Sequence, residues 1–450
     1  MRLERTALYS VRRGMGLVAT VLVAFPAGAA SILSDLTLSS SVGWSDNITG
    51  VASNQQTETM VGVGVQGVLG ADRRRSGLSG RFDLQYLNYL NNEFDDQVAG
   101  NADLQGRYEL VPDRLSLVVE DTFGQTQTSA FAPSTPETQQ NTNFLSAGPD
   151  LRLDLTNSLL FLGSVRYVIE TYETTPAENT RWQGTGGLHY EFSSRSSLGL
   201  LAQAQDVSFS DSAPYDDFSR RELLLRYRIN APRTTLQADG GRSEFRGRGV
   251  QQLSQDMWIY RIVVSRDLTN RSELSLSAGR EISDGGDLFA ATMETFGDSG
   301  NLRPMGLGAV QAIGNGVLAT GDAMRTFYWG ASWRYTAPRS TAYVGVEGRE
   351  ERYFSALSAN RDSIAAYMGF TRNLSDRILF GLDVRSGRRE SEVTTIKVDD
   401  FSVTLTGGYS FTQRLALSAS FEHTERQDNG GGDYADHRAW LRLAWAPTRR

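Results

Sequence analysis

An alternation of apolar and charged residues, repeated in segment after segment, constrains this chain more than any other feature. In NLSDRILFGLDVRSG (373–387), a polar turn is followed by an extended segment with two distinct sides. One side carries Ile378, Phe380, Leu382 and Val384, and the other carries Gly381, Asp383 and Arg385. Because successive side chains of a strand point to opposite faces, this period of two predicts a β-strand with one apolar and one charged face.

The same pattern recurs along the whole chain at a nearly constant interval. Turn-like residues followed by Arg or Ser open an alternating run at Arg114, Ser158, Arg195, Arg233, Arg271, Arg339, Arg377 and Arg414. Most neighbouring openers are 37 or 38 residues apart, and the two exceptions are 44 and 68. Each interval holds two runs of about 10–15 residues, whereas strands of soluble proteins usually have about 5–6. A propeller blade would need four short strands in the same length, so two long membrane-crossing strands fit better.

The strand pattern predicts an all-β, transmembrane, antiparallel up-and-down β-barrel of 20 strands, with 18 strands as the alternative count. Within lipid every backbone N–H and C=O must be paired internally, so spanning strands have to close on themselves. Closure turns the apolar face towards lipid and the charged face towards a wet lumen. A soluble sandwich also alternates, but a chain of 450 residues would then be expected to contain helices and short apolar core strands.

The beginning of the chain predicts export. Four arginines precede the apolar run GLVATVLVAF, and Ala27-Gly28-Ala29 supplies small residues at the cleavage spacing. The apolar run is too short for a single spanning anchor, which is the alternative. We therefore expect a signal peptide over residues 1–29 and a barrel over residues 30–450 in the outer membrane of a Gram-negative bacterium.

Two connections between strands are expected to be extended on the outer side, namely residues 127–141 and 283–323. The second is rich in Gly and Ala and weakly apolar. We expect it to fold over or into the mouth of the barrel and restrict passage. The alternative is an external hairpin on the rim around Asn315-Gly316.

The inward face of the strands is the best candidate for a functional site. The residues expected to line the lumen are Arg81, Asp83, Asp103, Arg107, Asp150, Arg152, Arg166, Glu170, Glu222, Arg226, Arg261, Arg334, Glu347, Arg349, Asp383, Arg385, Arg438 and Arg442. Mixed charge suits a hydrated channel wall whose opposite charges pair across strands. It also suits hydroxyl-rich or anionic sugar chains, which arginine binds through several donors. The sequence leaves both interpretations open.

Composition argues against several other classes of function. The chain has no cysteine and a formal charge of -7, which disfavours thiolate chemistry and nucleic acid as a partner. Its three histidines are scattered, with His189 expected in the lumen and His423 and His437 on the outer face. The DGGD segment (284–287) is expected to be a turn rather than a phosphate-binding loop. We therefore expect no enzyme activity, no catalytic residue, no metal and no cofactor.

Two stretches at the ends of the barrel resemble a known family. VGWSDNITG (42–50) and ASFEHTERQDNGGGDYADHRAWLRLAW (419–445) resemble the outer-membrane family known as beta-barrel porin 2. Members of that family are often encoded with exopolysaccharide synthesis and export systems, including those tied to PEP-CTERM sorting. One departure is that such barrels usually finish on an aromatic residue, whereas Trp445 is followed here by five further residues.

The resemblance implies a conduit or outer-membrane partner for exopolysaccharide export. The expected partners are then outer-membrane lipid, the secreted polysaccharide and a periplasmic polysaccharide exporter. A general diffusion porin for small solutes and a structural or adhesive surface barrel without transport are the alternatives.

Overall fold

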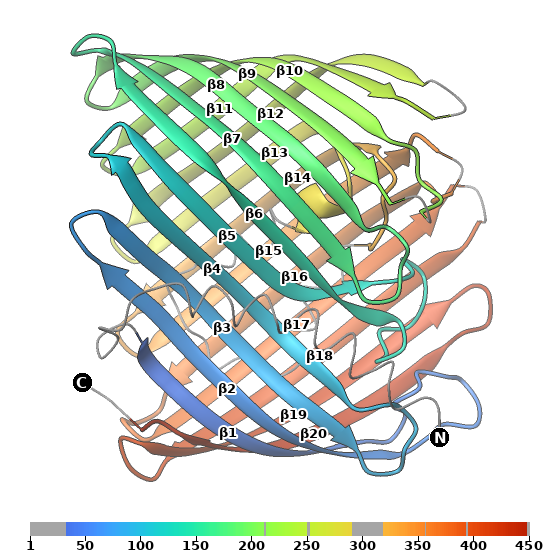
Figure 1. The fold of residues 1–450 in the computed structure, drawn as a ribbon. Helices are drawn as coiled ribbons and strands as arrows, with labels where there is room; N and C mark the ends of the chain where they lie inside the picture. Colours follow the sequence, from blue (N-terminus) through green and yellow to red (C-terminus); the bar gives the residue numbers. More distant parts are fainter. Residues whose placement is uncertain are drawn as a thin grey trace.

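A computed structural model of the chain describes residues 33–210, 213–249, 253–289, 318–355, 357–392 and 395–447. These residues form 20 strands in one antiparallel sheet, which is closed because β1 pairs with both β2 and β20 (Figure 1). The predicted transmembrane barrel and its count of 20 strands are therefore confirmed, and the count of 18 is wrong. The predicted signal peptide, residues 1–29, lies outside the described residues.

The strands are long, as the sequence predicts for tilted membrane-crossing segments. Their bounds are β1 (Leu33–Ser45), β2 (Glu58–Asp72), β3 (Ser76–Tyr89), β4 (Gln97–Val111), β5 (Leu115–Gln127), β6 (Gln139–Asp154), β7 (Leu159–Tyr172), β8 (Asn179–Ser193), β9 (Ser196–Phe209), β10 (Phe218–Ala231), β11 (Thr234–Gly247), β12 (Ser254–Thr269), β13 (Ser272–Ser283), β14 (Met324–Ala337), β15 (Ser340–Tyr353), β16 (Arg361–Asn373), β17 (Ile378–Ser391), β18 (Lys397–Ser410), β19 (Leu415–Asp428) and β20 (Tyr434–Trp445).

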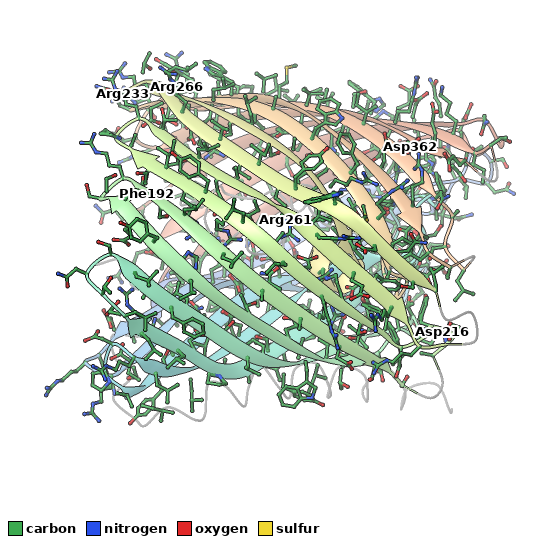
Figure 2. The ribbon with its side chains drawn as sticks, turned by 90° about the horizontal axis from the view of Figure 1, so that it is seen from above. Phe192, Asp216, Arg233, Arg261, Arg266 and Asp362 are labelled. Atoms are coloured by element: carbon green, nitrogen blue, oxygen red, sulfur yellow. The ribbon has the colours of Figure 1, made fainter. Side chains whose placement is uncertain are left out.

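The two ends of the barrel differ in the length of their connections. One end carries the short turns that follow even-numbered strands, such as 194–195, 232–233 and 270–271. The other end carries the longer connections that follow odd-numbered strands. Figure 2 shows this polarity, with Arg233 and Arg266 at the short-turn end and Asp216 and Asp362 at the other. β1 begins and β20 ends at the short-turn end, because Leu33 pairs with Leu69 and Trp445 with Leu415.

The register separates an apolar outer face from a polar inner face. Outward side chains include Trp258, which is 71% exposed, and Leu405, which lies between Leu382 and Phe421 on the neighbouring strands. Such contiguous exposed apolar surface is typical of the lipid-facing side of a membrane barrel, because its contact with water is unfavourable. Among the residues that the structure describes, no helix is long and apolar enough to cross a membrane.

Two adjacent residues of β18 provide a test of these faces. Leu405→Arg places a charge in the lipid-facing band and should lower the free energy of unfolding by about 2–4 kcal/mol. Thr404→Arg places the same charge in the lumen beside Asp383 and Glu422 and should leave the free energy of unfolding nearly unchanged. Urea titration of the barrel in phospholipid vesicles measures both, and equal losses in the two variants would contradict the assigned faces.

Candidate functional site

The residues that the sequence nominates for the lumen share one face of the sheet. The ladder register places all of them on the inward face: Arg81, Asp83, Asp103 and Arg107 on β3 and β4; Asp150, Arg152, Arg166 and Glu170 on β6 and β7; Glu222, Arg226 and Arg261 on β10 and β12; Arg334, Glu347 and Arg349 on β14 and β15; Asp383 and Arg385 on β17; Arg438 and Arg442 on β20. His189 also faces inward on β8, whereas His423 and His437 face outward and pair with each other across β19 and β20.

Many of the lumen charges pair across strands. Arg226 binds Asp239 through two hydrogen bonds, Nε to Oδ1 and Nη2 to Oδ2, both 2.7 Å long. Arg166 Nη2 lies 2.7 Å from Asp150 Oδ1. Arg334 differs, because its side chain is exposed and makes no ion pair with any residue that the structure describes. The wall is therefore a mixed-charge surface that is largely neutralised locally.

The connection between β13 and β14 enters the barrel at the end with the longer connections, which we call the outer end because membrane barrels place their short turns in the periplasm. Its described parts are 284–289 and 318–323, and both lie inside the lumen (Figure 1). Ala319 N donates to Gln127 O at 2.8 Å, and Phe354 N donates to Ala323 O at 2.9 Å. The alternative of an external hairpin concerned Asn315 and Gly316, which lie outside the described residues.

The expectation of a simple turn at 284–287 is wrong, because residues 285–289 form one turn of α-helix. Asp284 caps this turn, since its Oδ1 accepts a hydrogen bond of 2.8 Å from the backbone N–H of Asp287. Leu288 and Phe289 then pack into a buried cluster with Phe144, Val168, Met324 and Tyr353. Apolar burial against the lumen wall thus stabilises a helical turn that glycine-rich sequence alone does not favour.

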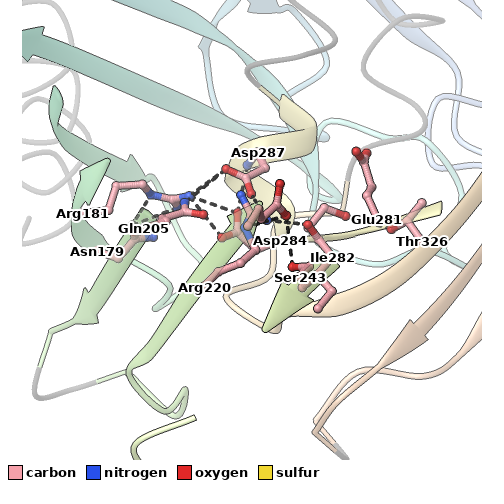
Figure 3. A network of polar contacts seen from close by, with 12 residues as sticks. Asn179, Arg181, Gln205, Arg220, Ser243, Glu281, Ile282, Asp284, Asp287 and Thr326 are labelled. Atoms are coloured by element: carbon pink, nitrogen blue, oxygen red, sulfur yellow. Dashed lines mark hydrogen bonds and ion pairs between the residues drawn. The ribbon is translucent and has the colours of Figure 1, made fainter. Parts of the chain in front are cut away.

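A buried charged network fixes this helical turn to the barrel wall (Figure 3). Arg181 Nη1 on β8 lies 3.1 Å from Asp284 Oδ2 and 3.3 Å from Asp287 Oδ1, and its Nη2 binds Glu170. Arg220 Nη1 on β10 lies 2.9 Å from Asp287 Oδ2. Arg181 is only 1% exposed, so its charge is compensated almost entirely by these carboxylates. We call Arg181, Arg220, Glu170, Asp284 and Asp287 the clamp.

The clamp continues into the lumen wall towards β12 and β13. Arg220 Nε lies 3.6 Å from Glu222 Oε1, and Arg261 Nη2 lies 3.3 Å from Glu222 Oε2. Arg261 Nε also donates to Glu281 Oε2 at 2.5 Å. Thus three residues nominated from the sequence, Glu170, Glu222 and Arg261, belong to this network.

The other clamp residues were missed by sequence reasoning. Arg181 alternates with the outward Trp182, so the period of two could have placed it in the lumen. Asp284 and Asp287 lie in a connection without periodicity, and no signal in the sequence indicates their partners.

A second connection, residues 128–138, also reaches across the outer end. Arg389 Nη1 on β17 donates to Ala130 O at 2.8 Å, and Arg426 Nη1 on β19 donates to Ala132 O at 2.9 Å. The predicted extended connection 127–141 is shorter than expected, because β5 runs to Gln127 and β6 starts at Gln139. A parallel bridge joins Leu318 of the β13–β14 connection to Gln127, the last residue of β5, directly before the second connection begins.

The two carboxyl groups of the clamp's helical turn differ in acidity. Burial raises the pKa of Asp284 to about 6, and the charge of Arg181 only partly offsets this effect. Burial acts in the same direction on Asp287, but Arg220 and Arg181 outweigh it and lower the pKa of that carboxyl. Asp287 is therefore the carboxylate that stays ionised at mildly acidic pH.

The fold is similar to several solved outer-membrane barrels. A ferric enterobactin receptor, PfeA from Pseudomonas aeruginosa, aligns at 9% sequence identity over 92% of this chain and 80% of that chain, with a TM-score of 0.45. OccK2 from Pseudomonas aeruginosa, solved with glucuronate, aligns at 10% identity over 92% of this chain and 98% of that chain, with a TM-score of 0.40. At these values the likeness carries no argument about function. No protein-family model matches the sequence, and no curated protein does.

Removing the central charge of the clamp should release the helical turn. Arg181→Gln leaves Glu170, Asp284 and Asp287 without their shared cation, and breaking a buried pair in this way typically costs about 3–5 kcal/mol. We expect faster proteolysis within the β13–β14 connection and a higher single-channel conductance. Arg166→Gln, which breaks the pair with Asp150 on the wall, is the control and should change neither. If the β13–β14 connection of Arg181→Gln were as resistant to proteolysis as that of the wild type, the role assigned to the clamp would be contradicted.

Mild acid should strengthen the docking of the helical turn. Because the pKa of Asp284 is raised from 3.8 to about 6, the docked state takes up a proton that the released state binds only at lower pH. Stability of docking therefore rises as pH falls from 7 to 5. The lowered pKa of Asp287 opposes this only below its ordinary value of 3.8.

Opening events in planar bilayers should accordingly be rarer at pH 5 than at pH 7.5. The Asp284→Asn protein should lose this pH dependence. More frequent opening of the wild-type channel at pH 5 would show that the sign is wrong.

Proposed function

We propose that this barrel is a conduit for a polar carbohydrate chain across the outer membrane, in exopolysaccharide export. The observation that carries the proposal is the clamp, which holds part of the β13–β14 connection inside the outer end of the lumen. A barrel of 20 strands without internal filling would leave a wide aqueous hole. A conduit for a secreted chain has to be wide yet closed between passages, and an ionic clamp on an inward-folded segment meets both requirements.

The chemistry of the wall supports a carbohydrate as the cargo. Sugar hydroxyls donate and accept hydrogen bonds, and the lumen offers guanidinium donors beside carboxylate acceptors, as in Arg385 and Glu347, 3.3 Å apart. These groups are partly exposed, so they can exchange water for hydroxyl groups at little cost in desolvation. Apolar cargo would leave them unsatisfied.

The resemblance of the two chain ends to the beta-barrel porin 2 family also supports the proposal. The stretches 42–50 and 419–445 meet at the closing seam, where Val42 pairs with Leu441 and Gly43 with Trp440. Asp46 Oδ2 lies 2.8 Å from His437 Nδ1 at the outer end of the same seam. The resemblance therefore concerns one spatial unit of the barrel, and a periplasmic exporter is the partner that it implies at the short-turn end.

A general diffusion porin for small solutes is the second candidate. The locally neutralised pairs, such as Arg226 with Asp239, favour it because they form a hydrated wall that needs no specific cargo. The two candidates differ in the resting state. A porin conducts small solutes at all times, whereas the proposed conduit stays closed until the helical turn is released.

Liposome swelling distinguishes the two candidates. The wild-type barrel should admit small sugars slowly, and the variant Asp287→Asn should admit them at least severalfold faster, because it removes the carboxylate that is bound while ionised. This variant removes only the carboxylate that both Arg181 and Arg220 bind, and it leaves Arg181 paired with Glu170 and Arg220 beside Glu222. If liposomes that contain the wild-type protein swell rapidly, and liposomes that contain the variant swell at the same rate, the porin is favoured. Deleting the gene in the source bacterium should abolish polysaccharide secretion, and intact secretion would refute export.

A further inference from the structure

Three tyrosines on neighbouring strands point into the lumen, and each lies over a glycine of an adjacent strand. Tyr328 on β14 pairs directly with Gly279, Tyr343 on β15 with Gly369, and Tyr367 on β16 with Gly345. A Cβ atom at any of these glycines would collide with the tyrosine ring, so each ring rests against the backbone of the wall. One face of each ring is thereby covered by the wall, while the three side chains as a whole remain partly exposed.

Each of these tyrosines also has an arginine as its partner on the opposite flank. Tyr328 pairs with Arg349, Tyr343 with Arg334 and Tyr367 with Arg385. The unit of glycine seat, tyrosine ring and arginine therefore occurs three times across five consecutive strands, β13 to β17. All three arginines face the lumen, and Arg334 is the exposed one without an ion pair among the described residues.

The three units ascend the wall from the short-turn end towards the clamp network. β15 starts at Ser340 and β16 ends at Asn373, both at the short-turn end. Tyr343 lies close to Ser340, whereas Tyr367 lies further from Asn373 than Tyr343 does from Ser340. Tyr328 lies higher on β14, near Glu281 and Arg261 of the network that continues from the clamp. The rings of Tyr343 and Tyr367 are 6.2 Å apart between centroids. Tyr343 and Tyr367 are thus neighbours, and Tyr328 lies further along the same side of the lumen.

Packing of an aromatic ring on a cross-strand glycine also stabilises sheets, and this barrel uses it on its outer face. Trp329 pairs with Gly348 there and covers it in the same way, facing lipid. The inner rings differ in their polar surroundings. The hydroxyl of Tyr343 donates to Asp383, and Tyr367 hydrogen-bonds Ser332. Stabilising the sheet does not require arginine beside each ring, so the packing alone leaves this arrangement unexplained.

We propose that these three units form a track that binds successive pyranose residues of a passing saccharide chain. The C–H face of a pyranose stacks on an aromatic ring, and the neighbouring guanidinium binds its hydroxyl or carboxylate groups. Several weak subsites in a row allow a chain to bind and still advance, because only part of its length is released at each step. The track deepens the proposed function, on which it rests, by naming the wall that contacts the cargo.

Calorimetric titration of the full-length barrel in detergent tests the track directly. The probes are a linear neutral glucose hexasaccharide and a hexauronate of equal length, which distinguish hydroxyl from carboxylate recognition. Tyr367→Ala and Tyr343→Ala should each raise the dissociation constant about fivefold, the equivalent of about 1 kcal/mol for a lost aromatic contact. Tyr367→Phe keeps the ring and should restore most of the affinity. Arg334→Gln should weaken the hexauronate more than the neutral chain.

Trp329→Leu is the matched control, because it removes a ring seated on glycine from the lipid-facing side. It should leave both dissociation constants unchanged even if it lowers stability. Equal affinity in Tyr367→Ala, Tyr343→Ala and wild type would overturn the track. If those variants bind like wild type while liposomes still admit sugars after release of the clamp, the track fails and the proposed function stands. If neither probe binds wild type and no sugar passes the released channel, both fail.

Discussion

Internal pairing of every backbone N–H and C=O within lipid is the constraint on which this structure depends. It requires the strands to close into a ring, and closure forces each strand to present one face to acyl chains and one to water. The stretch 373–387 shows the result in one strand, with Phe380 and Leu382 outside and Asp383 and Arg385 inside. The inward charges that are buried against the wall, such as Arg181, in turn need partners, because burial removes them from water. The ion pairs of the wall thus follow from the same requirement that closes the sheet.

The solvation of these ion pairs separates two roles. Arg385 and Glu347 remain partly exposed, so either can exchange its partner for water or for a ligand at small cost. Arg181 is almost fully buried, and its removal would leave Glu170 and Asp284 without a cation and Asp287 with Arg220 alone. Exposed pairs on the wall are therefore suited to transient contact with cargo, whereas the buried clamp is suited to holding a segment in its docked position. The proposed conduit and track depend on this difference.

The sequence predicted the repetitive part of the structure and failed where the structure is not repetitive. The interval of 37 or 38 residues, with arginine at the turns, predicted the number of strands, and the period of two left only two orientations for each nominated lumen residue. The helical turn at 285–289 was not predicted, since it depends on Leu288 and Phe289 meeting Phe144 and Val168 inside the barrel. The bond between Arg181 and Asp284 spans 103 residues of sequence, and local patterns carry no information about it.

The closing seam has a consequence for how the protein is made. β1 and β20 share a ladder only from Leu38 and Trp445 to Ser45 and Arg438, and β1 is irregular between Ser34 and Thr37, with Asp35 at a φ of 55°. β1 thus gains one of its two neighbours, β20, only after the strands between them have been translated. A chain that ended before β20 would expose two unpaired strand edges to the bilayer. Completion of synthesis is in this way a precondition for residence in the membrane.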